Sequence, residues 1–262
     1  IDKGFGTEQI EENIKIIFPT IKVQRMDYDT TRGKNSYENI ISNFEKGNTK
    51  ILIGTQMLSK GLDFDNVSLV GILNADSMLN FSDFRAYERA FQLMSQVAGR
   101  AGRKGKEGKV LVQTYDIDNN IFSLLKKGDF NQFASNQLKE RKIFSYPPYT
   151  RLIKISVKHK DQNKVEDASS LFSNLLKASF GSRVLGPEYP YVSRVRNNYI
   201  KNILIKIEHK SSIKEAKKIL LLVNQKIIVN NRYRNIKTDI DIDPLWFVNF
   251  AKKIISWKKY FY

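Results

Sequence analysis

Three polar side chains near the middle of the chain have the types and the spacing to bind a polyphosphate. Gln96, Arg100 and Arg103 stand four and three positions apart in the segment QVAGRAGR. At 100° per residue this spacing places all three on one face of a helix, which we expect to begin near Phe84. Guanidinium is always charged, binds phosphate oxygens through paired hydrogen bonds and can act as an arginine finger. The alternative is a solvated basic helix end that interacts favourably with its own dipole.

A second group of polar residues follows an apolar run that begins at Ile51. The run ends at Gly54, Thr55 and Gln56, so a buried strand is predicted to lead into a polar loop at its carboxyl end. Open α/β sheets hold their ligands at that edge. The sequence therefore predicts that both groups of residues belong to one α/β domain with its site at the ends of the strands.

The elements that must position these residues alternate along the first part of the chain. We expect a helix capped by Thr7 with an apolar stripe of Ile10, Ile14 and Ile17. Further elements are predicted as strands at 21–25, 67–75 (buried) and 109–115, and as helices at 37–44, from 84 and within 120–142. Strands that alternate with helices in this way predict a single parallel sheet with helical crossovers.

The composition favours a polyanionic partner and argues against a metal centre. Lys and Arg number 44 against 27 Asp and Glu, which gives a net charge of +17. Such an excess favours nucleic acid, because cations that neutralise phosphates release counterions. Codon bias would explain the choice of Lys over Arg, but it leaves the excess of cations unexplained. Cysteine is absent and histidine occurs twice, so a metal site is not expected.

In its motifs the chain resembles the second motor lobe of superfamily 2 helicases. GTQMLSKGLDF resembles the motif that couples DNA contact to ATP, and QVAGRAGR resembles the arginine-finger motif. The similarity is greatest to PriA-like replication-restart helicases, in which GTQM, KG, DF and QVAGRAGR occur in this order. The segments GFGTE and MDYDTT of this chain match the GxGTE and RMDxDTT patterns that precede them in that family. The resemblance implies a RecA-like lobe 2 with a parallel sheet.

The resemblance also implies a role for each residue of the motifs. Gly54, Thr55 and Gln56 would contact the backbone of the tracked DNA strand. Gly61, Asp63, Gln96, Arg100 and Arg103 would bind the nucleotide, with Arg103 as the finger and Arg100 also on the phosphates. Asp63 could instead be a plain turn residue. Asp76 is interpreted either as a residue of the lobe interface or as a simple strand cap.

The implied cofactor is ATP with Mg²⁺, shared with a lobe that this sequence does not contain. Neither a GxxxxGK[ST] loop nor a DExx box occurs here. The first residue, Ile1, suggests that the sequence is a C-terminal fragment. By the resemblance, zinc is expected only upstream, in the cysteine-rich region that precedes the GxGTE turn of PriA-like proteins. The chain alone is therefore predicted to be catalytically inactive.

The segment SYPPY divides the chain into predicted domains at 1–144 and 145–262, because consecutive prolines cannot continue a helix. After it, the pattern predicts a βαββαβ order, which is the ferredoxin-like plan and is similar to the ribosomal S10-like domain of the PriA-like family. Its first strand is expected to be half-buried, since Ile153, Ile155 and Val157 alternate with polar residues.

Two features of the second domain could contact DNA. Arg194 and Arg196 are predicted to lie in a basic loop or hairpin that binds DNA or a partner's acidic tail, or that is only a solvated tip. The tail 245–262 interleaves aromatic residues with lysines, as in segments that stack on unpaired bases. Packing of a terminal helix onto its own domain is the favoured interpretation of the tail.

Together these patterns indicate the C-terminal half of an ATP-dependent 3′–5′ DNA helicase that recognises forked DNA and initiates primosome assembly. By the same resemblance we expect a cytoplasmic, nucleoid-associated monomer whose partners are forked or single-stranded DNA, single-stranded DNA-binding protein and other primosome proteins, with no membrane association. The alternatives are another superfamily 2 helicase, or a non-catalytic nucleic-acid-binding module built on a degenerate motor lobe.

Overall fold

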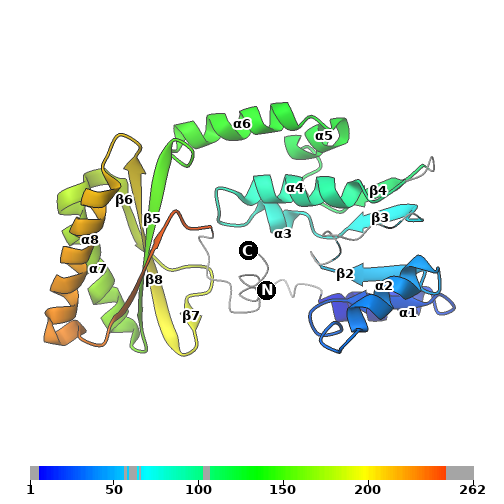
Figure 1. Ribbon diagram of the computed structural model, residues 1–262, viewed down its shortest axis with the longest axis horizontal. Coiled ribbons are helices and arrows are strands. Elements are labelled where there is room, and N and C mark those ends of the chain that lie inside the picture. Colours follow the sequence, from blue (N-terminus) through cyan, green and yellow to red (C-terminus); the bar gives the residue numbers. More distant parts are fainter. Residues whose placement is uncertain (1–5, 56–57, 59–63, 65, 103–106, 246–262) are drawn as a thin grey trace. The chain divides into compact units, whose positions relative to one another are not determined.

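The chain forms two compact units, each with its own secondary structure (Figure 1). The computed structural model describes residues 6–55, 58, 64, 66–102 and 107–245. The first unit contains Ile1–Asn80 and Ala86–Phe130, and the second contains Phe81–Arg85 and Asn131–Tyr262. The chain therefore passes between the units three times, at 80/81, 85/86 and 130/131. The short segment Phe81–Arg85 belongs to the second unit although both of its neighbours in sequence belong to the first.

The strands of the first unit pair in parallel, as predicted. β1 (Val23–Met26) pairs with β2 (Ile51–Gly54), and β3 (Leu69–Ile72) pairs with β4 (Lys109–Val112). In the described part of the chain these pairs are two separate sheets and not the single sheet that we expected. The prediction that β3 is buried is also wrong, because Leu69 is 54% exposed.

The helices of the first unit lie close to their predicted places, except for α3, which was not predicted. They are α1 (Thr7–Ile17), α2 (Ser36–Glu45), α3 (Asp76–Leu79), α4 (Ala86–Ala98) and α5 (Asn120–Lys127), and α6 (Phe130–Ile143) follows. Thr7 does not cap α1: Gly6 is the N-cap, and the Thr7 hydroxyl donates to Asp27 instead. The expected apolar stripe of α1 is not buried either, since Ile17 is 63% exposed.

Helix α4 ends earlier than the motif QVAGRAGR suggested. Its last residue is Ala98, so Gln96 lies in the final turn and Arg100 lies beyond the helix. The amides of Arg100 and Ala101 donate three residues back, and the amide of Gly102 donates to the Val67 carbonyl at 3.0 Å. Gly102 has a φ of +70°, a conformation that a glycine adopts without strain. The helix that was expected to carry both Gln96 and Arg100 therefore ends between them, at Ala98.

The second unit has the predicted βαββαβ order with one added strand. Its elements are β5 (Thr150–His159), α7 (Gln162–Phe180), β6 (Val184–Glu188), β7 (Arg194–Val195), β8 (Asn198–Glu208), α8 (Ile213–Val229) and β9 (Lys237–Ile242), with short 3-10 turns at Gly181–Arg183 and Asn231–Tyr233. The antiparallel sheet has the order β6-β8-β5-β9, and β7 pairs with β8. This strand order is that of the ferredoxin-like fold, so the predicted plan is confirmed.

Helices α7 and α8 cover one face of this sheet (Figure 1), and the core lies between them. Ile153, Ile155 and Val157 of β5 point into that core and are fully buried. The expectation of a half-buried strand is wrong, however, because Lys154 and Ser156 on the other face are only 6% and 2% exposed. None of the described helices is long and apolar enough to cross a membrane.

Candidate functional site

The first candidate site lies at the carboxyl ends of β1 and β2. Met26 and Gly54 are register partners at these ends, and Thr55 follows at the surface. A Cβ atom added to Gly54 would lie 2.7 Å from the Met26 carbonyl oxygen and 2.7 Å from the Leu58 side chain. Only glycine allows this approach, so β2 reaches its loop with its backbone unobstructed by a side chain of residue 54.

The loop after β1 is built around the carboxylate of Asp27. It accepts hydrogen bonds from the Thr7 hydroxyl at 2.7 Å and from the amides of Asp29 and Thr30 at 3.0 Å. Burial acts to raise the pKa of Asp27, but these bonds and the nearby Arg25 guanidinium outweigh it and hold the pKa below its usual value. The segment MDYDTT thus forms a rigid, charged turn beside the start of the β2 loop.

The second group of predicted site residues follows α4. Met94 is fully buried and anchors the helix, whereas Gln96 is exposed and Arg100 is partly exposed. An exposed amide and a guanidinium at the end of a buried helix suit an anionic ligand. Four further predicted residues, Gln56, Gly61, Asp63 and Arg103, lie outside the described residues, so their roles stay predictions.

Hydrogen bonds of Asp76 connect the segments that follow β3 and β4, the second parallel pair. Its carboxylate accepts from the Thr114 hydroxyl at 2.9 Å and from the Tyr115 amide at 3.0 Å, just after β4. Burial acts to raise the pKa of Asp76, but the bonds from Tyr115 and Thr114 lower it below its usual value. These contacts correspond to the cap that was one of the two interpretations of Asp76.

The basic residues Arg194 and Arg196 lie on a hairpin, as the sequence predicted. Strands β7 and β8 pair through Arg194 with Tyr199 and Val195 with Asn198. Arg196 and Asn197 form the turn, with φ values of 49° and 62°. The Arg194 guanidinium donates to the Asn197 side chain and lies 4.9 Å from the centre of the Tyr199 ring. One arginine is therefore held in place, and the other is presented at the tip.

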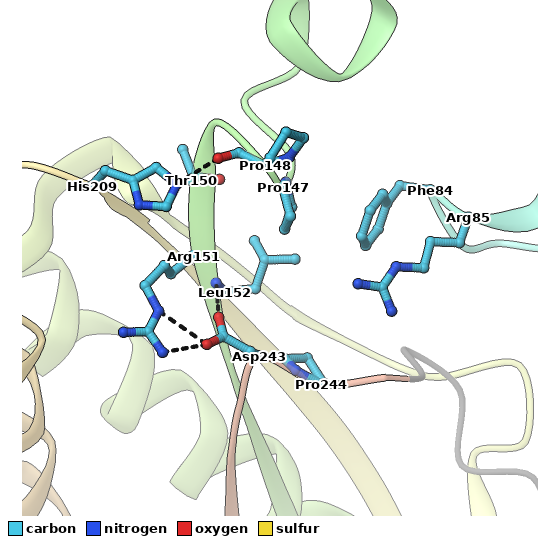
Figure 2. Close-up of a pocket in the computed structure, with 10 residues that line it drawn as sticks. All are labelled: Phe84, Arg85, Pro147, Pro148, Thr150, Arg151, Leu152, His209, Asp243 and Pro244. Carbon is cyan, nitrogen blue, oxygen red and sulfur yellow. Dashed lines mark hydrogen bonds and ion pairs between the residues drawn. The ribbon is translucent and has the colours of Figure 1, made fainter. Parts of the chain in front are cut away.

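A hollow of about 290 Å³ lies in the second unit, where the segment Phe81–Arg85 meets SYPPY. Its lining residues are drawn in Figure 2. Its apolar wall includes Phe84 and Leu152. Its polar groups bind one another: Arg151 Nε donates to Asp243 at 2.9 Å, and His209 Nε2 donates to the Pro148 carbonyl. The hollow therefore lies where chain segments of the second unit pack together, and hydrogen bonds between its own lining residues stabilise it.

A metal site is not evident in the described part of the chain, where no three His, Asp or Glu side chains form a ligand cluster. The donors near the end of α4 are instead an amide and a guanidinium, which bind phosphate oxygens. If the ligand is ATP with Mg²⁺, the described residues of this lobe therefore have donors suited to the phosphates but no cluster of ligands suited to the Mg²⁺.

Comparison with known families matches both units. Residues 6–105 match the helicase conserved C-terminal domain, and residues 142–245 match the primosomal protein N C-terminal domain. The replication restart protein PriA of Bacillus subtilis is 37% identical over 244 residues, which cover 92% of this chain and 30% of that protein. PriA of Synechocystis is 36% identical over 244 residues, covering 92% of this chain and 28% of the relative. Over 92% of its length this chain is similar to PriA proteins.

The PriA relatives are much longer than this chain, which spans about 30% of the length of the Bacillus subtilis protein. PriA of Chlamydia trachomatis is 44% identical over 152 residues, which cover 58% of this chain and 20% of that protein. Among solved structures, the C-terminal domain of the DEAD-box protein Dbp5 has a TM-score of 0.32 at 24% identity, covering 45% of this chain and 62% of its own. That likeness is too slight to support an argument.

The segments that match the two families include every site residue predicted from the motifs. Two features that organise the structure of the units were not predicted. Asp27 was visible only as part of MDYDTT, and nothing in the sequence indicated that three residues donate hydrogen bonds to its carboxylate. The stacking of Phe84 on Tyr146 was also missed. Phe84 was expected to lie near the start of the helix of Gln96, which begins at Ala86. The only signal in the sequence for the stacking was the aromatic composition of SYPPY.

Proposed function

We propose that this chain is the second motor lobe and C-terminal domain of an ATP-dependent 3′–5′ DNA helicase that acts in replication restart. The observation that carries the proposal is that one chain joins a helicase C-terminal domain to a primosomal protein N C-terminal domain, in that order. The names of its PriA relatives support the same process. An excess of 17 positive charges suits a nucleic-acid substrate.

In this proposal the end of β2 contacts the DNA backbone. Gly54, Thr55 and Gln56 would offer backbone amides and a hydroxyl, groups that bind phosphates without reading sequence. The close packing of Gly54 against Met26 supports a backbone contact, because it keeps a side chain off the β2 end. Arg194 and Arg196 of the hairpin would add a second contact.

The nucleotide would be ATP with Mg²⁺, and its hydrolysis would supply the free energy for translocation. Gly61 and Asp63 would lie beside the nucleotide, while Gln96, Arg100 and Arg103 would bind its phosphates. Arg103 would act as the finger, since a planar guanidinium stabilises the charge that develops on the transferred phosphoryl group. The Mg²⁺ and the remaining phosphate contacts would come from a P-loop lobe.

The partners in this proposal are forked or single-stranded DNA, single-stranded DNA-binding protein and other primosome proteins. The protein would act as a monomer on the DNA of the nucleoid. Primosome assembly would follow from recognition of the fork.

Steady-state ATPase assays on a protein in which a P-loop lobe precedes this chain test the proposal. We expect Arg103→Ala to reduce turnover by about a thousandfold or more at saturating DNA and ATP. Arg103→Lys should fail nearly as badly, because a flexible point charge cannot reproduce the planar fork. Gln96→Ala should cost less, since it removes a neutral contact. The control is Lys109→Ala, an exposed cation on β4.

The chain alone should hydrolyse no ATP, with or without DNA. If Arg103→Ala keeps more than about a tenth of wild-type turnover, the loss falls far short of that of an arginine finger and the motor assignment is wrong. In that case DNA binding without coupled hydrolysis would point to a non-catalytic nucleic-acid-binding module.

A further inference from the structure

A second hollow in the C-terminal unit is lined by nitrogen-bearing side chains. It has a volume of about 250 Å³ and lies where β5 ends and where β8 and β9 begin. Its lining residues are His159, Lys160, Asn198, Asn235 and Lys237. All five carry an N–H donor, and none of them is acidic. The chemistry of the lining therefore selects a ligand rich in acceptor oxygens.

The imidazole of His159 is oriented so that it can donate to such a ligand. The backbone amide of Asp161 donates to His159 Nδ1 at 2.9 Å. A nitrogen that accepts a hydrogen bond carries no proton, so the neutral ring has its proton on Nε2. The local fold thereby fixes the donor tautomer of this histidine.

Nearby carboxylates are engaged elsewhere, which leaves the hollow positive. Asp161 caps α7, where its side chain accepts from the amides of Asn163 and Lys164. Asp239 pairs with Lys158. Within the described part of the chain, Lys160 and Lys237 form no ion pair of their own. Two lysine charges are therefore available to an anion.

The hollow is continuous with the basic hairpin. His159 and Tyr199 are register partners on β5 and β8, and the Arg194 guanidinium lies over the Tyr199 ring. Asn198 lines the hollow and donates to the Arg196 carbonyl at 3.0 Å, so it also braces the turn. The arginines of the hairpin and the lysines of the hollow thus belong to one end of the sheet.

We propose that this hollow binds a phosphodiester group of a nucleic-acid backbone, with Lys160 and Lys237 as its charged ligands and His159 Nε2 as a neutral donor. The inference rests on the proposed function for the source of the phosphate, whereas the oxyanion site itself rests on the lining. A phosphate group has several acceptor oxygens. It is favoured over a ligand with only one acceptor atom, because several donors surround the same space. Contacts of this kind position a strand without reading its bases.

Binding of a fluorescent oligothymidylate to this chain, measured by anisotropy over a range of salt concentrations, tests the assignment. Each lost phosphate contact lowers the slope of log affinity against log salt by about 0.7 for single strands. Lys160→Ala/Lys237→Ala should therefore lower the slope by about 1.4. The matched control is Lys214→Ala/Lys217→Ala on α8, which removes the same charge from exposed positions and should leave the slope nearly unchanged. Lys160→Arg/Lys237→Arg should retain the wild-type slope.

A second arm uses inorganic phosphate and NMR of the His159 ring and of the Asn198 and Asn235 side-chain amides. We expect phosphate to shift these resonances in the wild type and not in Lys160→Ala/Lys237→Ala. If phosphate shifts them but the DNA slopes of the two double alanine variants agree, the site takes free phosphate and the nucleic-acid assignment is overturned.

The two arms separate failure of this site from failure of the proposed function. If neither DNA binding nor the resonances respond to the lysine substitutions, there is no oxyanion site in the hollow. If the chain binds no DNA at all while phosphate still shifts the resonances, the DNA contact of the C-terminal domain is wrong and the oxyanion site stands.

Discussion

The ring of Phe84 stacks on the ring of Tyr146, with centroids 4.8 Å apart and planes inclined by 6°. The Arg141 guanidinium lies 4.9 Å from the Phe84 centroid, and the Lys206 ammonium lies 4.0 Å from that of Tyr146. Burial and the charge of Asp83 raise the pKa of the Tyr146 phenol, which keeps it neutral. This cluster of two rings and two cations explains why the segment before α4 belongs to the second unit.

A double-mutant cycle on Phe84→Ala and Tyr146→Ala should detect the stack as a coupling of about 1 kcal/mol, the typical worth of an aromatic pair beyond its buried area. Native-state hydrogen exchange of β5 and β8 amides reports the stability of the second unit. As a control, Phe84→Ala combined with Tyr191→Ala should be additive, because Tyr191 is 88% exposed. Equal coupling in both cycles would show that the rings do not stabilise the unit by stacking.

Gly54→Ala should destabilise the first unit by about 1 to 3 kcal/mol, since the new methyl group would overlap a backbone oxygen that cannot easily move. The matched control is Gly71→Ala in β3, where an added Cβ has no atom within 4 Å. That change should stabilise by about 0.5 kcal/mol, because alanine loses less backbone entropy than glycine. Exchange of the β1 and β2 amides, for Gly54, and of the β3 and β4 amides, for Gly71, measures the two effects. Similar values for both variants would contradict the close packing at Gly54.

The sequence predicted the elements that have a strong local signal. Asp161 and Ser212 have side chains of the types that favour N-caps, and these side chains accept from the first-turn amides of α7 and α8. Apolar and polar residues also alternate along much of β5, β8 and β9, three strands of the ferredoxin-like sheet. These patterns depend on neighbours in sequence, so no knowledge of the tertiary structure was needed.

The errors arose where contacts between distant residues decide the outcome. Spacing alone placed Arg100 on the helix of Gln96, but the helix ends at Ala98, and the Gly102 amide donates to the Val67 carbonyl instead of continuing the helix. Thr7 has the side chain of an N-cap, yet it bonds to Asp27, twenty residues away. Lys154 occupies a polar position in the alternation and is buried all the same. A local pattern contains no information on any of these partners.

Lys154→Met should stabilise the second unit by about 1 kcal/mol at neutral pH, as often happens when a buried charge is replaced by an apolar group of similar volume. Burial lowers the pKa of Lys154, and although Asp241 acts to raise it, the net pKa is below its usual value. The unfolded chain therefore binds more protons, and wild-type stability rises with pH between the folded pKa and about 10.4. The advantage of the methionine should shrink over that range.

Lys158→Met is the control for Lys154→Met, because Lys158 lies four residues further along the same face of β5 and pairs with the exposed Asp239. Pairs of this kind contribute about 0 to 1 kcal/mol, so the substitution should have little effect. Exchange of the β5 amides at pH 7 compares the two variants. A loss of stability in Lys154→Met would mean that the ammonium is well compensated where it lies.

Asp27→Asn should destabilise the first unit by about 1 to 3 kcal/mol at neutral pH, because the amide cannot accept as many charge-assisted hydrogen bonds as the carboxylate. The carboxylate has a folded pKa below its usual value, so its contribution is complete above about pH 4, the unfolded pKa. It is lost as the pH falls through the folded pKa, where protonation removes the charge that the surrounding donors stabilise.

The difference between wild type and Asp27→Asn should therefore be constant from pH 7 to about pH 5 and should shrink below about pH 4. Urea unfolding at a series of pH values, with exchange of the β1 amides as the local readout, measures this convergence. Asp118→Asn, at an exposed position after β4, controls for the loss of one negative charge and should follow the wild type throughout. If the Asp27→Asn difference stays constant down to pH 3, the carboxylate of Asp27 is not the group that organises the MDYDTT turn, because a titrating anchor must lose its effect when it is protonated.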